Sequence, residues 1–194
     1  MNPYDIVVIG AGHAGCEAAL AAARLGARTA LITMDRQAVA RLSCNPSIGG
    51  IAKSHMVFEL DALGGEMALN TDCTGIQFRV LNRRKGPAVR ANRAQCDKPA
   101  YSARMLNVLQ IQPHLTLIQD QIESIRVEQE HITGACGRRY GLIPAQAVIL
   151  TAGTFLRGKI FIGKQVISGG RLGEPAEDNL SLQLQRLGFR MERL

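Results

Sequence analysis

A cysteine in a loop of turn-forming residues is the first candidate for chemistry. Cys44 lies within residues 43–50, where asparagine, proline and serine lead to a glycine pair. This composition predicts a shaped loop whose glycines let backbone amides approach a ligand. A thiolate stabilised by such amides, a helix N-terminus, and Lys53 or His55 would be a nucleophile. The alternative is a small buried residue, as most free cysteines are, and the spacing leaves both readings open.

A glycine turn near the N-terminus predicts dinucleotide binding. Residues 10–15 have glycine at the first, third and sixth positions. The first glycine permits a tight turn, the second lets the backbone approach a pyrophosphate, and the third lets the next helix pack closely. The alternative for His13 is a polar residue on the turn. The expected contacts with the dinucleotide are Gly10, Ala11, Gly12, His13, Ala14 and Gly15.

A run of positive charge is the third candidate. Six cations and no acid fall within residues 79–93, and a Gly-Pro pair interrupts any continuous helix. We expect this run on a loop-and-turn frame. Basic runs usually form a solvated face, but the Asn and Gln interspersed here suit phosphate contacts. Flavin phosphates, a folate-like carboxylate and RNA are the candidate anions for Arg79, Arg83, Arg84, Lys85, Arg90 and Arg93.

The elements that position these residues predict an α/β fold. Residues 6–9 are continuously apolar, which is typical of a strand buried in a parallel sheet, and an alanine-rich helix over residues 14–25 follows. Further helices are expected at 52–63, 97–109 and 180–187. The first would have Met56, Leu60 and Leu63 on one face. The last would be capped by Asp178 or Asn179 and would have Leu180, Leu184 and Leu187 on one stripe. Further strands are expected at 27–33, 115–118 and 147–150, with an antiparallel excursion at 126–128 and 131–135 and a strand-like stretch at 158–163.

The residues at the ends of the later strands indicate which dinucleotide cofactor is bound. A ribose-binding carboxylate is expected at the end of the second strand, where the sequence has Thr33, with Asp35 two residues on. Either could hold the ribose. The strand at 147–150 runs into Thr-Ala-Gly-Thr, which is typical of flavoproteins with two dinucleotide motifs. We therefore expect a Rossmann-like FAD-binding fold of that type, with further cofactor contacts at Ile122, Thr151 and Gly153.

The composition indicates the kind of partner and the cellular compartment. The chain has 194 residues, 46% of them hydrophobic, and a formal charge of +7, which favours a polyanionic partner such as nucleic acid. No stretch approaches the roughly 18 apolar residues of a membrane helix, and the first strand begins too early for a signal peptide. The five scattered cysteines predict neither disulfides nor a metal site, so a reducing cytoplasm is expected.

Several segments together resemble one family. They are residues 10–19, 43–50, 61–65, 75–79, 85–90, 93–95 and 154–156. These segments are similar to the N-terminal part of the MnmG family, also called GidA, the flavoproteins of tRNA uridine 5-carboxymethylaminomethyl modification. The similarity runs from Tyr4 to about Pro175. It covers nearly the whole chain.

The resemblance implies an activity and its participants. FAD would be the bound cofactor, NADH the reductant and methylenetetrahydrofolate the one-carbon donor, acting at C5 of the tRNA wobble uridine with the partner GTPase MnmE. The full-length protein would be a homodimer. Cys44 matches the family's cysteine, whose thiolate could add to C6 of a flipped-out uracil or line the flavin.

The chain departs from the family pattern in two ways, and other functions are alternatives to the one that the resemblance implies. Residues 82–84, Asn-Arg-Arg, carry more charge than the family pattern, and the family is much longer. We therefore expect an FAD-binding domain over residues 1–154 and the truncated start of a second, inserted domain over 155–194, inactive by itself. The rivals are the folate- and FAD-dependent tRNA uridine methyltransferase, which lacks the 43–50 loop, and a non-catalytic RNA-binding or assembly module. A disulfide reductase would need a CxxxxC, which Cys44 does not provide.

Overall fold

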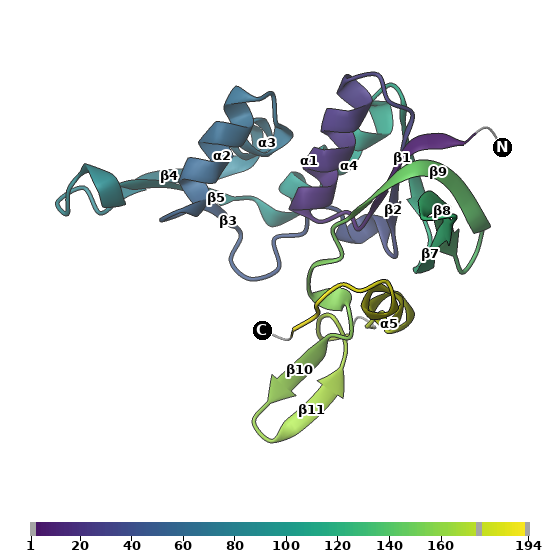
Figure 1. Cartoon of the computed structure of the whole chain (residues 1–194). Helices are drawn as coiled ribbons and strands as arrows, with labels where there is room; N and C mark the ends of the chain where they lie inside the picture. Colours follow the sequence, from purple (N-terminus) through teal and green to yellow (C-terminus); the bar gives the residue numbers. More distant parts are fainter. Residues whose placement is uncertain (1–2, 174–175, 193–194) are drawn as a thin grey trace.

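The computed structural model describes residues 3–173 and 176–192. Four strands pair in parallel in the order β6-β2-β1-β9. Their bounds are β1 (Tyr4–Ile9), β2 (Thr29–Thr33), β6 (Leu115–Gln119) and β9 (Gly141–Leu150). Helices α1 (His13–Arg24) and α4 (Lys98–Ile111) lie together on one side of this sheet (Figure 1). The predicted Rossmann-like core is confirmed.

An antiparallel meander extends the same sheet. It consists of β7 (Ile122–Glu128), β8 (His131–Gly137) and the first part of β9. Strand β9 is longer than predicted because its first part pairs with β8 and its second part, from Ala145 on, pairs with β1. The predicted antiparallel excursion is confirmed, and β7 begins earlier than expected.

The alternation of side chains along β1 divides the interior into two cores. Val8 joins the core beneath α1 and α4, which contains Leu20, Tyr101 and Met105. Val7 and Ile9 face the other way, into a core shared with the meander and α5 (Asn179–Arg186). Because both faces of the strand are covered, its sequence is apolar without interruption, as expected of a buried parallel strand.

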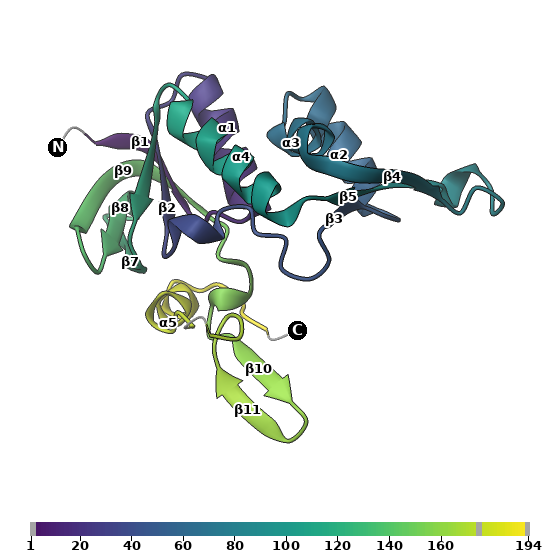
Figure 2. The ribbon, with the colours of Figure 1, turned by 180° about the vertical axis from the view of Figure 1, so that it is seen from behind.

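A second lobe lies beside α1 and α4, with α3 against both helices. A three-stranded antiparallel sheet in the order β3-β5-β4 lies beside two helices, as Figures 1 and 2 show from opposite sides. The bounds are β3 (Ser47–Gly49), α2 (Lys53–Ala62), α3 (Glu66–Thr74), β4 (Gly75–Leu81) and β5 (Ala91–Cys96). The loop-and-turn frame expected for the basic run is wrong, because β4 and β5 form a hairpin around a short 3-10 helix at Pro87–Val89.

Two details of the lobe and its surroundings correct the sequence interpretation. Met56 and Leu63 do not form a packed stripe with Leu60, since they are 68% and 86% exposed, and α2 packs through Val57 and Leu60. A 3-10 helix at Arg36–Ala38 follows β2, and its N-cap is Asp35, whose carboxylate accepts from the Gln37 amide at 2.8 Å. Residues 43–46 lead from this turn into β3, so the second half of the expected 43–50 loop is a strand instead.

The segment after β9 contains a 3-10 turn at Gly153–Phe155, a hairpin of β10 (Lys159–Ile162) and β11 (Gln165–Ser168), and α5. Leu180 and Leu184 are buried against β7, but Leu187 is 45% exposed, so the expected stripe is only partly packed. Within the described part of the chain, neither Asp178 nor Asn179 caps the helix through its side chain. Instead the Glu177 carboxylate accepts from the amides of Asn179 and Leu180 at 2.9 and 3.2 Å. None of the described helices is long and apolar enough to cross a membrane.

Candidate functional site: a cavity at the glycine turn

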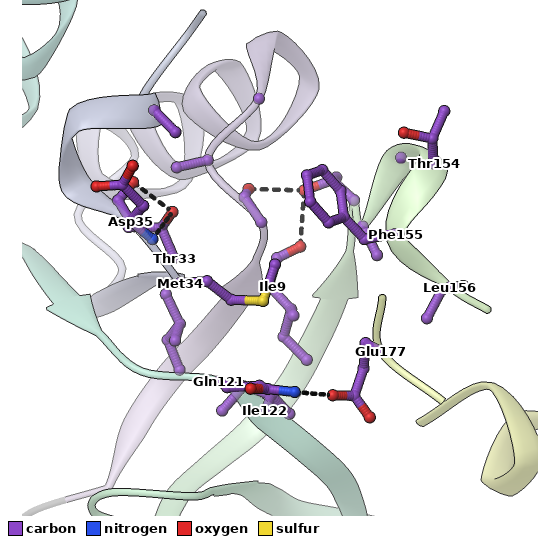
Figure 3. Close-up of a pocket in the computed structure, with 18 of the residues that line it drawn as sticks. Ile9, Thr33, Met34, Asp35, Gln121, Ile122, Thr154, Phe155, Leu156 and Glu177 are labelled. Atoms are coloured by element: carbon purple, nitrogen blue, oxygen red, sulfur yellow. Dashed lines mark hydrogen bonds between the residues drawn. The ribbon is translucent and has the colours of Figure 1, made fainter. Parts of the chain in front are cut away.

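A cavity of about 280 Å³ lies where β1, β2 and β9 end. The carboxyl ends of parallel strands are where open α/β sheets bind ligands. Figure 3 shows Thr33 and Asp35 on one side of this cavity, and Phe155 and Glu177 on the other. The predicted cofactor residues that line it are Gly10, Ala11, Gly12, His13, Thr33, Asp35, Ile122, Thr151 and Gly153. Ala14 is exposed outside the lining, and Gly15 is buried beneath the turn.

The glycine turn shows why two of its positions exclude side chains. Gly10 has a φ of +100°, which favours glycine. A Cβ on Gly15 would lie 1.7 Å from the Gly10 carbonyl oxygen and 2.7 Å from Thr151 Oγ1. Thr151 Oγ1 also donates to the carbonyl oxygens of Ile9 and Gly10, at 2.9 Å each. The end of β9 thus fixes the turn from behind.

The second glycine of the motif, Gly12, is different. A Cβ there would meet nothing within 4 Å, and the residue lines the cavity. Gly12 is the N-cap of α1, and among the residues that the structure describes no side chain caps the helix. Uncapped amides at a helix N-terminus favour an anion, and Arg41 and Arg171 also line the cavity. The turn therefore fits the pyrophosphate of a dinucleotide, whose approach needs the space that a side chain at this position would fill.

The side chains at the end of β2 differ in what they can offer a ribose. Thr33 Oγ1 is already bonded, donating to the Asp35 carbonyl oxygen at 3.0 Å. The Asp35 side chain is 49% exposed and 3.6 Å from Arg41. Because an ionised carboxylate accepts more bonds than the Gln37 amide supplies, Asp35 keeps acceptor capacity toward the cavity. Both residues line the cavity, and Asp35 is the better placed acceptor.

The opposite wall contains residues that the sequence interpretation missed. Asp120 is buried, and its carboxylate accepts from the amides of Gln121, Arg139 and Tyr140 at 2.8, 2.9 and 3.1 Å. It thereby holds the entry to β7 against the β8–β9 turn. Gln121 donates to Glu177, as the dashed line in Figure 3 marks, which ties this wall to the start of α5.

Arg171 and Phe155 were also missed. The Arg171 guanidinium lies 5.5 Å from the centre of the Phe155 ring, and both line the cavity. The two residues are 16 positions apart, and only the Gly-Gly-Arg loop that contains Arg171 gave a local signal. Their contact brings a cation and an aromatic face to the side of the cavity opposite Asp35.

His13 begins α1 and faces a polar part of the interior. Its ring centre is 5.7 Å from that of Tyr101, and within the described residues Nε2 is buried without a hydrogen-bond partner. Burial, together with the smaller effects of the positive charges of Lys53 and Arg171, lowers the pKa of His13 from its ordinary 6.5 to about 4. The imidazole is therefore neutral near pH 7 and can offer one hydrogen bond to a ligand in the cavity.

This lowered pKa predicts a loss of stability in acid. Between pH 6.5 and about 4 the unfolded chain binds a proton at His13 and the folded chain does not. The free energy of unfolding should therefore fall as the pH drops through this window, by up to about 3 kcal/mol. Urea unfolding at several pH values should show a weaker dependence for His13→Gln. The exposed His114→Gln should keep the original slope, and equal slopes for all three proteins would contradict the assignment.

The remaining predicted residues lie away from this cavity. Cys44 is exposed on the loop before β3 and does not line the cavity at the glycine turn. Arg79, Arg83 and Arg93 line a different cavity in the second lobe. Arg84, Lys85 and Arg90 are exposed toward the end of the β4–β5 hairpin. The structure thus gathers the cofactor candidates and separates them from both the cysteine and the basic run.

A parallel sheet with a glycine turn after β1, an antiparallel meander before β9 and a cavity at the strand ends define the Rossmann-like FAD-binding fold of flavoproteins. The chain belongs to the family described as Glucose inhibited division protein A, GIDA, whose model matches residues 5–194. The family resemblance inferred from the sequence is confirmed.

Individual relatives agree with this assignment. The chain is 54% identical, over 98% of its length, to the tRNA uridine 5-carboxymethylaminomethyl modification enzyme MnmG of Pelobacter propionicus, of which it covers 30%. It matches the structure of Aquifex aeolicus GidA with a TM-score of 0.92 and 48% identity, covering 97% of this chain and 31% of that one. The GidA-related protein of Thermus thermophilus matches with a TM-score of 0.71 and 25% identity, over 98% of this chain and 71% of that one. The chain therefore spans about 30% of the length of the first curated relatives.

Proposed function

We propose that this chain is the FAD-binding part of an enzyme that modifies C5 of the tRNA wobble uridine. The observation that carries the proposal is the open space at Gly12, before the uncapped N-terminus of α1, in a chain 54% identical to an enzyme of that name. FAD would lie with its pyrophosphate at the glycine turn. Because the chain spans only part of its relatives, the modification belongs to the whole protein. The FAD-binding domain would comprise residues 1–154, with 155–194 beginning an inserted domain.

The described residues would each have a defined task in holding the cofactor. The first amides of α1 would bind phosphate oxygens, and Asp35, or Thr33 less directly, would accept from the ribose. Ile122, Thr151 and Gly153 would line the part of the cofactor beyond the glycine turn. The bound flavin would supply the redox and one-carbon transfer chemistry, with NADH as reductant and methylenetetrahydrofolate as donor.

Cys44 is the proposed nucleophile toward uracil. Its thiolate would add to C6, which places the electron pair of the C5–C6 bond on C5 and its conjugated carbonyl and makes C5 reactive toward a one-carbon electrophile. Loss of the C5 proton and departure of the thiolate would restore the double bond. Exposure of Cys44 on the loop is consistent with access by an RNA base.

A Cys44→Ser change in the full-length enzyme should abolish wobble-uridine modification if the thiolate adds to C6. Serine is far less ionised near pH 7, so at least a 100-fold loss of rate is expected. The modified nucleoside can be measured in digested tRNA by mass spectrometry. Cys73→Ser is the matched control because Cys73 is also exposed. Full modification by the Cys44 variant, with FAD bound normally, would remove this residue from the mechanism.

The partners follow from the same proposal. The basic hairpin residues Arg84, Lys85 and Arg90 are exposed and suit the tRNA backbone, with Arg79, Arg83 and Arg93 nearer the lobe. We propose the GTPase MnmE as partner, a homodimer as the full-length state, and the cytoplasm as the location.

The direct test is to titrate the purified chain with FAD. Binding is followed by flavin absorbance at about 450 nm and by the quenching of flavin fluorescence. Saturable binding in the micromolar range or tighter supports the proposal. A chain that binds no flavin but shifts tRNA in a salt-dependent manner would instead be an RNA-binding module. A methyl group at C5 in place of the carboxymethylaminomethyl group, in the full-length reaction, would indicate the folate-dependent methyltransferase.

A further inference from the structure

The second lobe contains its own cavity, separate from the one at the glycine turn. It has a volume of about 430 Å³ and shares no lining residue with the first cavity. Its lining residues come from helices α2 and α3 and from the β3-β5-β4 sheet, which lie next to one another in Figure 2. Apolar, cationic and carboxylate side chains all contribute to its lining. Such a combination of an apolar body with a few polar groups is typical of small-molecule sites.

Two aromatic rings mark the apolar part. Phe58 on α2 and Phe78 on β4 both line the cavity, and they are 53% and 59% exposed. Phe78 rests against Gly75, where a Cβ would lie 2.3 Å from Cζ of the ring. The glycine therefore makes room for the ring at the cavity. Exposed aromatic faces beside a groove offer stacking surfaces to planar ligands.

The strand side supplies positive charge. Arg79 and Arg93 are directly opposite each other in the β4–β5 register, and Arg83 lies nearby in the lining. Like charges at opposed positions destabilise a strand pair. In the ranges 3–173 and 176–192 no ion pair joins these three arginines to an acidic side chain. A bound anion would offset this repulsion.

The helix side supplies acceptors and a buried hydroxyl. Asp61 on α2 and Asp72 on α3 line the cavity. Ser54 also lines it and is 3% exposed, yet among the described residues its Oγ has no hydrogen-bond partner. A buried polar group without a partner costs about 1–3 kcal/mol. A ligand with hydrogen-bonding groups on that side would remove this cost.

We propose that this cavity binds a nucleoside monophosphate. The base stacks on Phe58 and Phe78, its N–H edge donates to Asp61, Asp72 or Ser54, and the phosphate binds Arg79 and Arg93. A simple anion would not use the aromatic rings or the carboxylates, and an apolar ligand would leave five charged groups unused. The ligand is either a free nucleotide or one nucleotide of an RNA strand. The proposal goes beyond FAD binding, because it concerns a different cavity.

The test is isothermal titration calorimetry of the chain, saturated with FAD, with guanosine 5′-monophosphate, whose base presents two adjacent N–H donors to a carboxylate. Ribose 5-phosphate, which has no base, should bind at least 10-fold more weakly. Phe78→Ala should weaken guanosine 5′-monophosphate binding about 5- to 150-fold, as loss of one stacking face predicts. Arg93→Gln should weaken binding and lower its dependence on salt.

Matched controls separate the cavity from general effects. Phe161→Ala and Arg186→Gln replace exposed residues outside the lining, and both should bind the nucleotide as the original chain does. FAD absorbance should be unchanged in all four variants, which reports folding and the first cavity independently. Should the chain bind no FAD, the proposed function fails, and the Phe78 comparison still decides this inference.

A single-stranded pentaribonucleotide with a central guanosine distinguishes the sources. Tighter binding of the oligonucleotide than of the free nucleotide, reduced by Phe78→Ala, identifies an RNA nucleotide as the ligand. Equal or weaker binding identifies a free nucleotide. The inference is overturned if neither the nucleotide nor the oligonucleotide binds, if ribose 5-phosphate binds as well as the nucleotide, or if Phe78→Ala has no effect.

Discussion

Replacing Gly15 by alanine should destabilise the chain and abolish FAD binding together. The new methyl group would lie 1.7 Å from the Gly10 carbonyl oxygen, a backbone atom that accepts a hydrogen bond from Thr151 Oγ1. The turn or the start of α1 must therefore move. Overpacking of this kind costs about 1–3 kcal/mol or more, and the displaced amides can no longer converge on a phosphate. Urea unfolding and an FAD titration measure the two effects.

Gly12→Ala is the matched control, because its methyl group would meet nothing within 4 Å. Gly12 has a φ of −70°, which alanine adopts readily, so the free energy of unfolding should change by less than about 1 kcal/mol. FAD affinity should nevertheless fall at least 10-fold, which corresponds to about 1.4 kcal/mol. Unchanged FAD affinity in this variant would mean that the cofactor does not approach the glycine turn.

These two glycines show how far the sequence could predict the site. The spacing of residues 10–15 between an apolar run and an alanine-rich stretch encodes local geometry, so the turn and both flanking elements were predicted, and nine of the eleven predicted cofactor residues line the cavity. Thr151 followed from its place in the Thr-Ala-Gly-Thr sequence after an apolar strand, and it lines the cavity. The opposite wall did not follow, because Asp120 and Arg171 reach the cavity through long-range contacts and local sequence patterns carry no signal for such contacts.

The basic run shows a different kind of error. The positive charges of Arg79 and Arg93 and the Gly-Pro pair between them favoured the prediction of a loop. The apolar residues at 76, 78 and 80, however, alternate with polar positions as in a half-buried strand. Reading that period would have predicted β4. The partner strand β5 places Arg93 opposite Arg79, a relationship that depends on hairpin register. The cavity between this sheet and α2 could be recognised only once the register was known.

The connection between the two lobes depends on a buried carboxylate that no sequence pattern predicted. Glu66, at the start of α3, is 4% exposed and lies 2.6 Å from Arg24 on α1 and 2.8 Å from Arg104 on α4. Arg24 also donates to the Gly64 carbonyl oxygen at 2.7 Å. From α1, the Glu17 carboxylate accepts from the amides of Glu66 and Met67, which caps α3. These contacts attach the second lobe to the dinucleotide fold.

Glu66→Ala should consequently be among the most damaging single substitutions. It would leave the guanidinium groups of Arg24 and Arg104 without their shared partner, and breaking a buried ion pair from one side costs about 3–5 kcal/mol. Urea unfolding should report this loss. Glu128→Ala is the matched control, because Glu128 pairs with Arg126 at 2.7 Å but both side chains are at least half exposed. An exposed pair contributes about 0–1 kcal/mol, so a similarly small effect at Glu66 would show that the lobe is held by apolar packing alone.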